Sequence, residues 1–319
     1  MVFGLSLLGD AFAPIDYPSS NPFNLKFVQF DNKVLANRLN RNNLNVSIQN
    51  SSYAVKESVK DNLLILDGEI TELSINYSRK VSEKLDFYLK VPIYSFSKGF
   101  LDQPIEEWHE LLGLSDGSRE HLSKDQLQYK VQVNSIKEVF QDSFIGIGDI
   151  QISSKLNFYS KNYNDLNFIT ILELPSGSQK KNFGNGYLDG IVALNLRNTE
   201  IDNLIIDSVF GLSIFNEKNN QIVEEKNLAS FSKILLSWQP EYFFSKEIKN
   251  SLIYKINFEI FEPQIKSDFK SLGDVFYIFG LGATYRIAAN KYFNFGFSED
   301  VKVNSSADFS FIFGFDFKI

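Results

Sequence analysis

The last residues of the chain, 307–319, form the pattern that most limits how it can fold. Large apolar side chains occupy every second position up to the final residue: Phe309, Phe311, Phe313, Phe315, Phe317 and Ile319. The positions between them are mostly small or charged: Ser310, Ile312, Gly314, Asp316 and Lys318. Because successive side chains of a strand point to opposite faces, this segment has one aromatic face and one largely polar face. The pattern favours a strand between lipid and water; the alternative is a soluble sandwich that buries the aromatic face.

Alternation of this kind recurs along most of the chain. It is cleanest over residues 252–261, where charged residues, among them Lys255 and Glu259, share one face. A strand in the wall of a membrane barrel must keep its charged residues on one face, since a charge facing the bilayer centre costs about 2–4 kcal/mol. Three such segments precede residue 99 and nine follow residue 142, at 44–48, 73–77, 85–93, 150–158, 166–174, 191–197, 204–215, 230–243, 252–261, 276–287, 292–298 and 309–319.

These segments predict an all-β fold, a transmembrane antiparallel up-and-down β-barrel of about 12 strands over residues 43–319. Short connections at 81–84, 160–165, 198–203, 245–250 and 288–291 alternate with long ones at 175–188, 216–229 and 263–273. Short turns are typical of the periplasmic end and long loops of the extracellular end, so both chain termini are expected on the periplasmic side. A barrel of 14 strands is the alternative, if residues 23–30 and part of an inserted hairpin belong to the wall.

An inserted segment at residues 99–142 interrupts the alternation. Pro104 suits the first helical position, and Glu106 and Glu107 follow where the helix dipole favours negative charge. We expect a short helix over residues 104–112, with an apolar stripe of Ile105, Trp108, Leu111 and Leu112. A small hairpin over 127–133 and 136–140 follows. A 99–142 insertion with its own structure, extracellular or folded inward, is uncommon unless it has a function.

The N-terminal residues precede the alternating part. Residues 1–13 combine an apolar run with Ala11-Phe12-Ala13, the form of a signal-peptidase site, but lack a basic start. We interpret them as a truncated signal peptide; the alternative is a tail that packs against the protein. Residues 14–42 are rich in Pro, Asn and Ser and are expected to form a plug or a periplasmic segment.

Composition excludes several classes of protein. No run beyond the first residues approaches the ~18 apolar residues of a membrane-spanning helix. The chain has 31 Phe, one Met and no Cys, which suits lipid-facing strands and passage through an oxidising periplasm. A net charge of −7 argues against a nucleic-acid partner. No motif indicates a cofactor.

The inserted helix gathers candidate functional residues, Asp102, Glu106, Trp108 and His109. One interpretation is an acidic helix that packs its Trp108 stripe against the barrel wall or lumen. A second is a constriction or lid that selects what passes. Glu106 and His109 share a helix face and could bind a cation, but with two His and no Cys in the chain we assign no metal site.

Two further groups of charged residues are candidates. Lys255, Glu259 and Arg286 are expected to face the lumen, either paired with one another or lining an aqueous path. Asp67, Glu69 and Asp149 are expected at extracellular strand ends, where neighbouring glycines permit close backbone approach. They are structural there or form a ligand or divalent-cation site.

The sequence gives little support to catalysis. Outer-membrane phospholipases carry a His-x-Ser-Asn phrase, whereas His121-Leu122-Ser123 continues with Lys124 here. No Gly-x-Ser-x-Gly phrase occurs either. We therefore assign no catalytic residues, and an outer-membrane hydrolase is the least favoured function.

Several phrases carry a resemblance to a known family. They are Asn21-Pro22-Phe23, Leu66-Asp67-Gly68-Glu69, Phe100-Leu101-Asp102, Ile105-Glu106-Glu107-Trp108-His109-Glu110, the stretch 113–119, Gly146-Ile147-Gly148-Asp149 and Leu174-Pro175-Ser176-Gly177. The chain resembles Gram-negative outer-membrane β-barrels catalogued as a domain of unknown function, loosely similar to channels for aromatic hydrocarbons and fatty acids. Its last strand resembles the signal read by the barrel assembly machinery, with Ile319 in place of the usual Phe. The resemblance implies a cell outer membrane location, among lipid and lipopolysaccharide.

Two functional hypotheses follow. The first is a passive, porin-like channel that transports small apolar or amphipathic molecules. The second is a plugged structural or adhesive barrel whose insertion binds an external partner.

Overall fold

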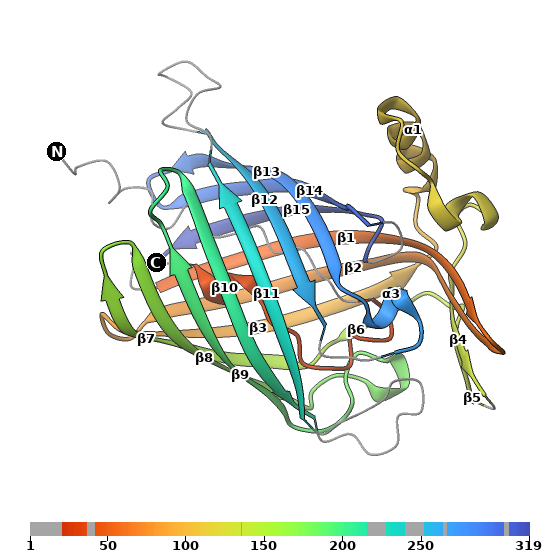
Figure 1. Ribbon diagram of the computed structural model, residues 1–319, viewed down its shortest axis with the longest axis horizontal. Helices are drawn as coiled ribbons and strands as arrows, with labels where there is room; N and C mark the ends of the chain where they lie inside the picture. Colours follow the sequence, from red (N-terminus) through yellow and green to blue (C-terminus); the bar gives the residue numbers. More distant parts are fainter. Residues whose placement is uncertain are drawn as a thin grey trace.

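The computed structural model describes residues 21–36, 42–134, 136–215, 228–239, 252–263, 267–302 and 306–319. Within these residues the strands form one antiparallel sheet (Figure 1). Its strands are β1 (Asn42–Val59), β2 (Asn62–Lys80), β3 (Leu85–Ser97), β4 (Gln128–Val133), β5 (Ile136–Phe140), β6 (Phe144–Ile147), β7 (Ile150–Lys161), β8 (Asn164–Leu174), β9 (Asp189–Asn198), β10 (Leu204–Ile214), β11 (Leu228–Trp238), β12 (Leu252–Glu262), β13 (Phe276–Ala288), β14 (Lys291–Asp300) and β15 (Phe309–Lys318).

The sheet closes on itself as a barrel. Neighbouring wall strands pair in chain order, β15 pairs with β1 from Asn43↔Lys318 to Ser52↔Phe309, and β2 pairs with β3. The described wall has 12 strands, with β4, β5 and β6 as extra strands outside the closed cycle. Closure removes the free edges that an open sheet would present. The predicted 12-strand antiparallel barrel is confirmed.

Side-chain direction follows the predicted alternation. On β15, Phe313 and Phe315 are each 44% exposed, whereas the intervening Gly314 and the preceding Ile312 are buried in the interior. On β12, Lys255 and Glu259 are 5% and 2% exposed and face inward. Apolar side chains on the outside and polar ones inside are the arrangement that a lipid environment requires.

A ribbon extends beyond the wall at one end of the barrel. β1 and β2 pair with each other as far as Val59↔Asn62, past the last residues that pair with β15 and β3. β4 pairs with this part of β2 through Leu63↔Gln132 to Asp67↔Gln128, and β5 pairs with β4. Figure 1 shows the ribbon and the β4–β5 hairpin projecting past the barrel. The inserted hairpin therefore extends the sheet without entering the wall.

The helices are short. α1 (Asp102–Leu112) begins two residues before the expected start and ends at Gly113, whose φ of 69° is left-handed. The others are α3 (Lys270–Gly273) and the 3₁₀ turns η3 (Asn32–Leu35), η4 (Gly117–His121) and η5 (Gln179–Lys181). Among the described residues, none of the helices is long and apolar enough to cross a bilayer.

The structure differs from several predictions made from the sequence. Residues 23–30 form turns and irregular backbone and not a wall strand, so the 14-strand alternative is wrong. β1 and β2 are much longer than the segments expected at 44–48 and 73–77, because their outer halves pair beyond the wall. The expected signal peptide at 1–13, part of 14–42 and the turn at 245–250 lie outside the described residues.

Candidate functional site

Residues 21–36, here called the inner segment, lie inside the barrel. Phe23, Phe27, Val28 and Val34 are each at most 2% exposed. At the end of the barrel where the ribbon projects, the Pro22 carbonyl accepts a hydrogen bond from Asn182 Nδ2 at 2.5 Å. The segment continues through the interior toward the end where β1 begins.

Side chains from opposite sides of the wall hold the inner segment. Asn32 bridges two wall residues: it donates to Glu259 Oε2 of β12 at 2.8 Å and accepts from Lys233 Nζ of β11 at 3.0 Å. Across the barrel, Lys33 Nζ donates to Ser47 Oγ of β1 at 3.1 Å. Since β11 and β12 lie far from β1 around the closed sheet, these contacts span the lumen.

The end of the inner segment is held on a third side. The Ala36 carbonyl accepts hydrogen bonds from Lys155 Nζ of β7 at 2.6 Å and from the Tyr88 hydroxyl of β3 at 3.4 Å. Asp31 lies 3.8 Å from Lys90 Nζ of β3. The segment therefore contacts the wall through polar side chains, and it takes no part in the β-sheet.

Aromatic side chains fill the interior toward the ribbon end. Phe96 contacts Phe144 and Phe183 with ring centroids 5.0 and 5.1 Å apart. On another side, Phe27 contacts Phe215 at 5.4 Å. The same cluster includes apolar residues of several wall strands, Phe231, Phe261, Phe276, Ile169, Ile171, Ile191, Val209 and Leu235. We call this the aromatic zone; burial of these side chains packs the inner segment against the wall.

The interior toward the opposite end is polar. Arg197 of β9 donates to both carboxylate oxygens of Asp207 of β10 at 2.9 and 2.7 Å, and both residues are almost fully buried. Lys233 and Glu259 pair at 2.8 Å. A cavity beside the inner segment is lined by polar residues, among them Asn45, Ser47, Asn76, Lys255, Asn294 and Asp316. We call this the polar zone.

The predicted lumen residues fall into two groups. Lys255 lines the cavity and Glu259 binds the inner segment, so both lie in the interior. Arg286 is exposed near the end of β13, where the register with β14 shifts, and its Nε donates to the Ala288 carbonyl at 3.4 Å. Arg286 still pairs in register with Tyr292, and the shift comes after it, so its exposure follows from its place at the end of the strand.

The insertion helix does not lie in the lumen, which corrects the lid hypothesis for Asp102, Glu106, Trp108 and His109. Trp108 packs edge-on against Phe297 of β14 at 5.8 Å. Phe297 and Glu299 alternate with the buried, inward Ser298 and share the outward face with Phe295. α1 therefore rests on the outside of the wall.

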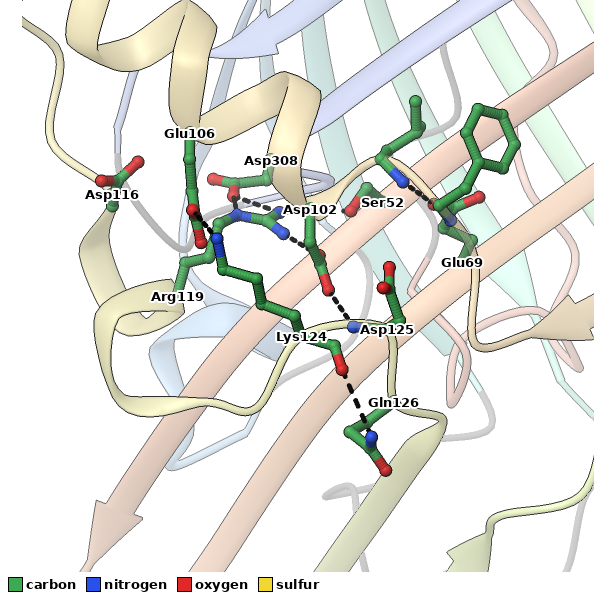
Figure 2. Close-up of polar contacts among 12 residues, drawn as sticks. Ser52, Glu69, Asp102, Glu106, Asp116, Arg119, Lys124, Asp125, Gln126 and Asp308 are labelled. Atoms are coloured by element: carbon green, nitrogen blue, oxygen red, sulfur yellow. Dashed lines mark hydrogen bonds and ion pairs between the residues drawn. The ribbon is translucent and has the colours of Figure 1, made fainter.

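A buried polar cluster joins the insertion to the barrel (Figure 2). Arg119 of η4 donates to Asp308 Oδ2 through Nε at 3.1 Å and Nη2 at 2.7 Å, and to Ser52 Oγ of β1 at 3.1 Å. It also pairs with Asp102 at the start of α1. Glu106 pairs with Lys124. Charge-assisted contacts of this kind hold three separate segments together.

His109 adds a second link between α1 and β14. Its Nδ1 lies 2.8 Å from Asp116 Oδ1 and its Nε2 lies 3.0 Å from Glu299 Oε1. Burial acts to lower the pKa of His109, but the hydrogen bonds to both carboxylates and the charge of Asp308 outweigh it, so the pKa is raised. Two carboxylate acceptors favour the imidazolium, because only that form donates from both nitrogens.

Asp67 and Glu69 lie on the outward face of β2 under the insertion. Glu69 Oε1 accepts hydrogen bonds from the backbone N–H groups of Phe100 and Leu101, each at 2.7 Å. Its Oε2 accepts from Asn50 Nδ2 at 2.7 Å. Asp67 is 4% exposed. Glu69 therefore fixes the point where the chain turns into α1.

Asp149 lies elsewhere, at the break between β6 and β7. Its Oδ1 accepts from the Gly177 N–H at 2.6 Å, and Ser176 Oγ donates to the Gly148 carbonyl at 3.1 Å. Burial raises the pKa of Asp149, although backbone donors of the 175–188 loop oppose this. The structure thus assigns Asp149 and the pair Asp67 and Glu69 to different segments and does not gather them into one site. No group of three or more potential metal ligands occurs among the described residues.

The sequence-based predictions missed that some wall strands also turn apolar side chains inward, into the aromatic zone. A signal was present: Phe168-Ile169 and Ile171-Leu172 place apolar residues on both faces of one strand. Such pairs indicate a strand buried on its inner side as well.

Solved structures resemble the chain in fold. The crystal structure of the COG4313 outer membrane channel from Pseudomonas putida F1 has 13% identity, covers 88% of this chain and 96% of its own, and gives a TM-score of 0.51. The NanC porin (6% identity, coverage 86% and 100%, TM-score 0.47) and the CymD monoaromatic hydrocarbon channel (9%, 98% and 96%, 0.44) are also similar. No curated protein matches the sequence.

The family model for DUF3187, described as a protein of unknown function, matches residues 33–319. That match covers all of the wall strands and the insertion. The chain therefore belongs to the DUF3187 family.

Proposed function

We propose that this protein is an outer-membrane channel for small amphipathic molecules and that the inner segment controls passage through it. The observation that carries the proposal is the position of residues 21–36 inside a closed wall, held on opposite sides by side chains of β1 and β12. The aromatic and polar zones follow one another along the same interior. A molecule with an apolar body and a polar group would find both environments on its path.

The contacts of the inner segment suit a part that moves. Beside the apolar packing in the aromatic zone, its polar contacts are side-chain hydrogen bonds and one ion pair, such as Asn32 with Glu259 and Lys33 with Ser47. Each contributes about 0.5–1.5 kcal/mol net. A segment held this way can be released without breaking the β-sheet, whereas a paired strand could not.

Planar-bilayer conductance of the refolded full chain tests the proposal. A variant with both Asn32→Ala and Lys33→Ala loses the polar contacts to β1, β11 and β12, and we expect it to open more often than the wild type. Glu200→Ala, an exposed change between β9 and β10, is the matched control and should leave conductance unchanged. The proposal fails if all three proteins are sealed and none binds the apolar fluorophore N-phenylnaphthylamine.

A plugged adhesive barrel is the second candidate, favoured by the position of α1 on the outer face of the wall. Deletion of residues 100–141 separates the two. The deletion removes Phe140, whose ring lies 6.1 Å from Phe23 of the inner segment, so a channel should change its conductance. An adhesive barrel would lose binding to its partner while its permeability stays constant.

The proposed location is the cell outer membrane, surrounded by lipid and lipopolysaccharide. The outward aromatic residues of β15 support it, and we infer that this last strand is recognised by the barrel assembly machinery. Fractionation of membranes on a sucrose gradient tests the location, and recovery with the inner membrane would contradict it.

A further inference from the structure

One face of helix α1 begins buried and ends exposed. Ile105, Trp108, Leu111 and Leu112 are spaced so that they share one side of a helix. Ile105 is 2% exposed, yet Leu111 and Leu112, one turn beyond Trp108, are 76% and 52% exposed. Half of the apolar face therefore packs on the barrel and the other half extends past it.

The covered half continues directly into the outer aromatic surface of the wall. Trp108 contacts Phe297, and Phe297 stacks on Phe309 of β15 with centroids 5.7 Å apart. Phe309 belongs to the same outward row as Phe313 and Phe315, the lipid-facing residues of β15. The exposed leucines thus follow, along the same helix, a tryptophan that packs on this outward aromatic surface.

The chain after the helix adds a further exposed apolar side chain. Gly113 turns the backbone with a left-handed φ of 69°, and the Leu114 N–H donates to the His109 carbonyl at 2.9 Å. Leu114 is 45% exposed. The opposite face of α1 carries Gln103, Glu106, Glu107 and Glu110, so the helix is polar on the side away from the wall.

We propose that Leu111, Leu112 and Leu114 form an interfacial anchor that dips into the lipid surface beside the barrel. The occupant of this face is the acyl region at the edge of the bilayer. Leucines on one face and charged residues on the other give α1 the amphipathic character of a helix that lies along a membrane surface, with acidic residues in place of the more usual basic ones. The inference rests on the membrane location proposed above and goes beyond the channel function, because it assigns the insertion a role outside the lumen.

The absence of cysteine allows a direct test. Single variants Leu112→Cys, Glu110→Cys, Val139→Cys and Phe313→Cys each receive a nitroxide label in the full chain, refolded into dilauroylphosphatidylcholine vesicles. All four positions are exposed, so the changes leave the core intact. Glu110 is the matched control on the opposite face of the same helical turn, and Val139 is a control on the projecting β5. Collision rates with oxygen and with a water-soluble nickel chelate report lipid and water contact.

We expect the ratio of oxygen to nickel collisions at residue 112 to be several-fold higher than at residues 110 and 139, and close to that at residue 313. A water-like ratio at 112 with a lipid-like ratio at 313 would overturn the anchor while leaving the barrel in the membrane. A water-like ratio at 313 would overturn the membrane location and the anchor with it. Leu111→Cys provides a second labelled position on the same face if the first protein refolds poorly.

Discussion

The Asp149 carboxylate accepts a hydrogen bond from the Gly177 backbone N–H at 2.6 Å, which joins the break between β6 and β7 to the loop that follows β8. Gly184 lies against the same carboxylate: a Cβ there would be 2.5 Å from both of its oxygens. The loop from 175 to 188 is therefore fastened to the wall at the ribbon end of the barrel. It carries Phe183 into the aromatic zone.

Replacing Asp149 should release this loop. A hydrogen bond to a charged group contributes about 1.5–3 kcal/mol, and Asp149→Ala removes the acceptor while leaving the Gly177 N–H unpaired. We expect faster tryptic cleavage after Lys180 and Lys181 than in the wild type. Asp149→Asn keeps one acceptor oxygen and should show an intermediate rate.

Asp142→Ala is the control for the loop experiment, because Asp142 is an exposed aspartate in the segment before β6. It should leave cleavage at Lys180 and Lys181 at the wild-type rate. Equal rates in Asp149→Ala and wild type would show that Phe183 and its aromatic neighbours hold the loop without the carboxylate.

The ion pair of Lys233 and Glu259 connects the wall to the inner segment. The side chains are 2% and 3% exposed and 2.8 Å apart. Lys233→Met leaves Glu259 buried without its cation, which costs about 3–5 kcal/mol. We expect this loss in the free energy of unfolding measured with urea in detergent micelles, and a smaller loss in the double variant Lys233→Met with Glu259→Met. If the double variant loses as much free energy of unfolding as the single one, the unpaired charge of Glu259 is not the cause of the loss. The ion pair itself would then contribute net stability.

The wall was accessible from sequence because its chemistry repeats. Adjacent residues of a strand face lipid and the interior in turn. Phe313 faces outward and Gly314 inward, and likewise Ile256 faces outward and Lys255 inward. This period of two fixed the strand number and the position of the insertion. Local spacing also located α1, through Pro104 near its start and Gly113 at its end.

The interior was less accessible, because its contacts join residues far apart in the chain. Asn32 meets Glu259 across 227 positions, and Arg119 meets Asp308 across 189. The side of the wall on which α1 lies depends on the register that puts Glu299 outward, and no pattern within residues 99–142 encodes that register. The motifs ending in Asp149 and Gly177 were visible, but their contact depends on how β7 pairs with β8.

The docking of α1 should depend on pH through His109. Its ring faces Asp116 and Glu299 directly, with Asp308 and Arg119 in the adjoining cluster. Because the folded pKa is raised above 6.5, the stabilisation is fully present below about pH 6.5 and is lost as the pH rises through the folded value. Asp308 acts with the same sign, since burial raises the pKa of its carboxyl despite the opposing charge of Arg119.

Trp108 reports this docking when Trp238, the second tryptophan, is replaced by Phe. We expect acrylamide to quench Trp108 more strongly as the pH increases above 6.5. In the same background, His109→Gln should be quenched strongly at low pH and show a much weaker pH dependence. A pH response unchanged in His109→Gln would assign the effect to Asp308 and its neighbours.

Gly99 and Gly113 flank α1 with similar backbone angles but different surroundings. Both are left-handed, with φ of 75° and 69°, so alanine at either position costs about 1–2 kcal/mol in backbone energy. A Cβ at Gly99 would also lie 2.1 Å from Glu69 Cδ, whereas nothing lies within 4 Å of one at Gly113. Gly99→Ala must therefore displace the carboxylate that accepts from the Phe100 and Leu101 N–H groups. We expect hydrogen exchange of residues 100–105 to accelerate far more in Gly99→Ala than in Gly113→Ala, and comparable acceleration would show that Glu69 does not hold the start of the helix.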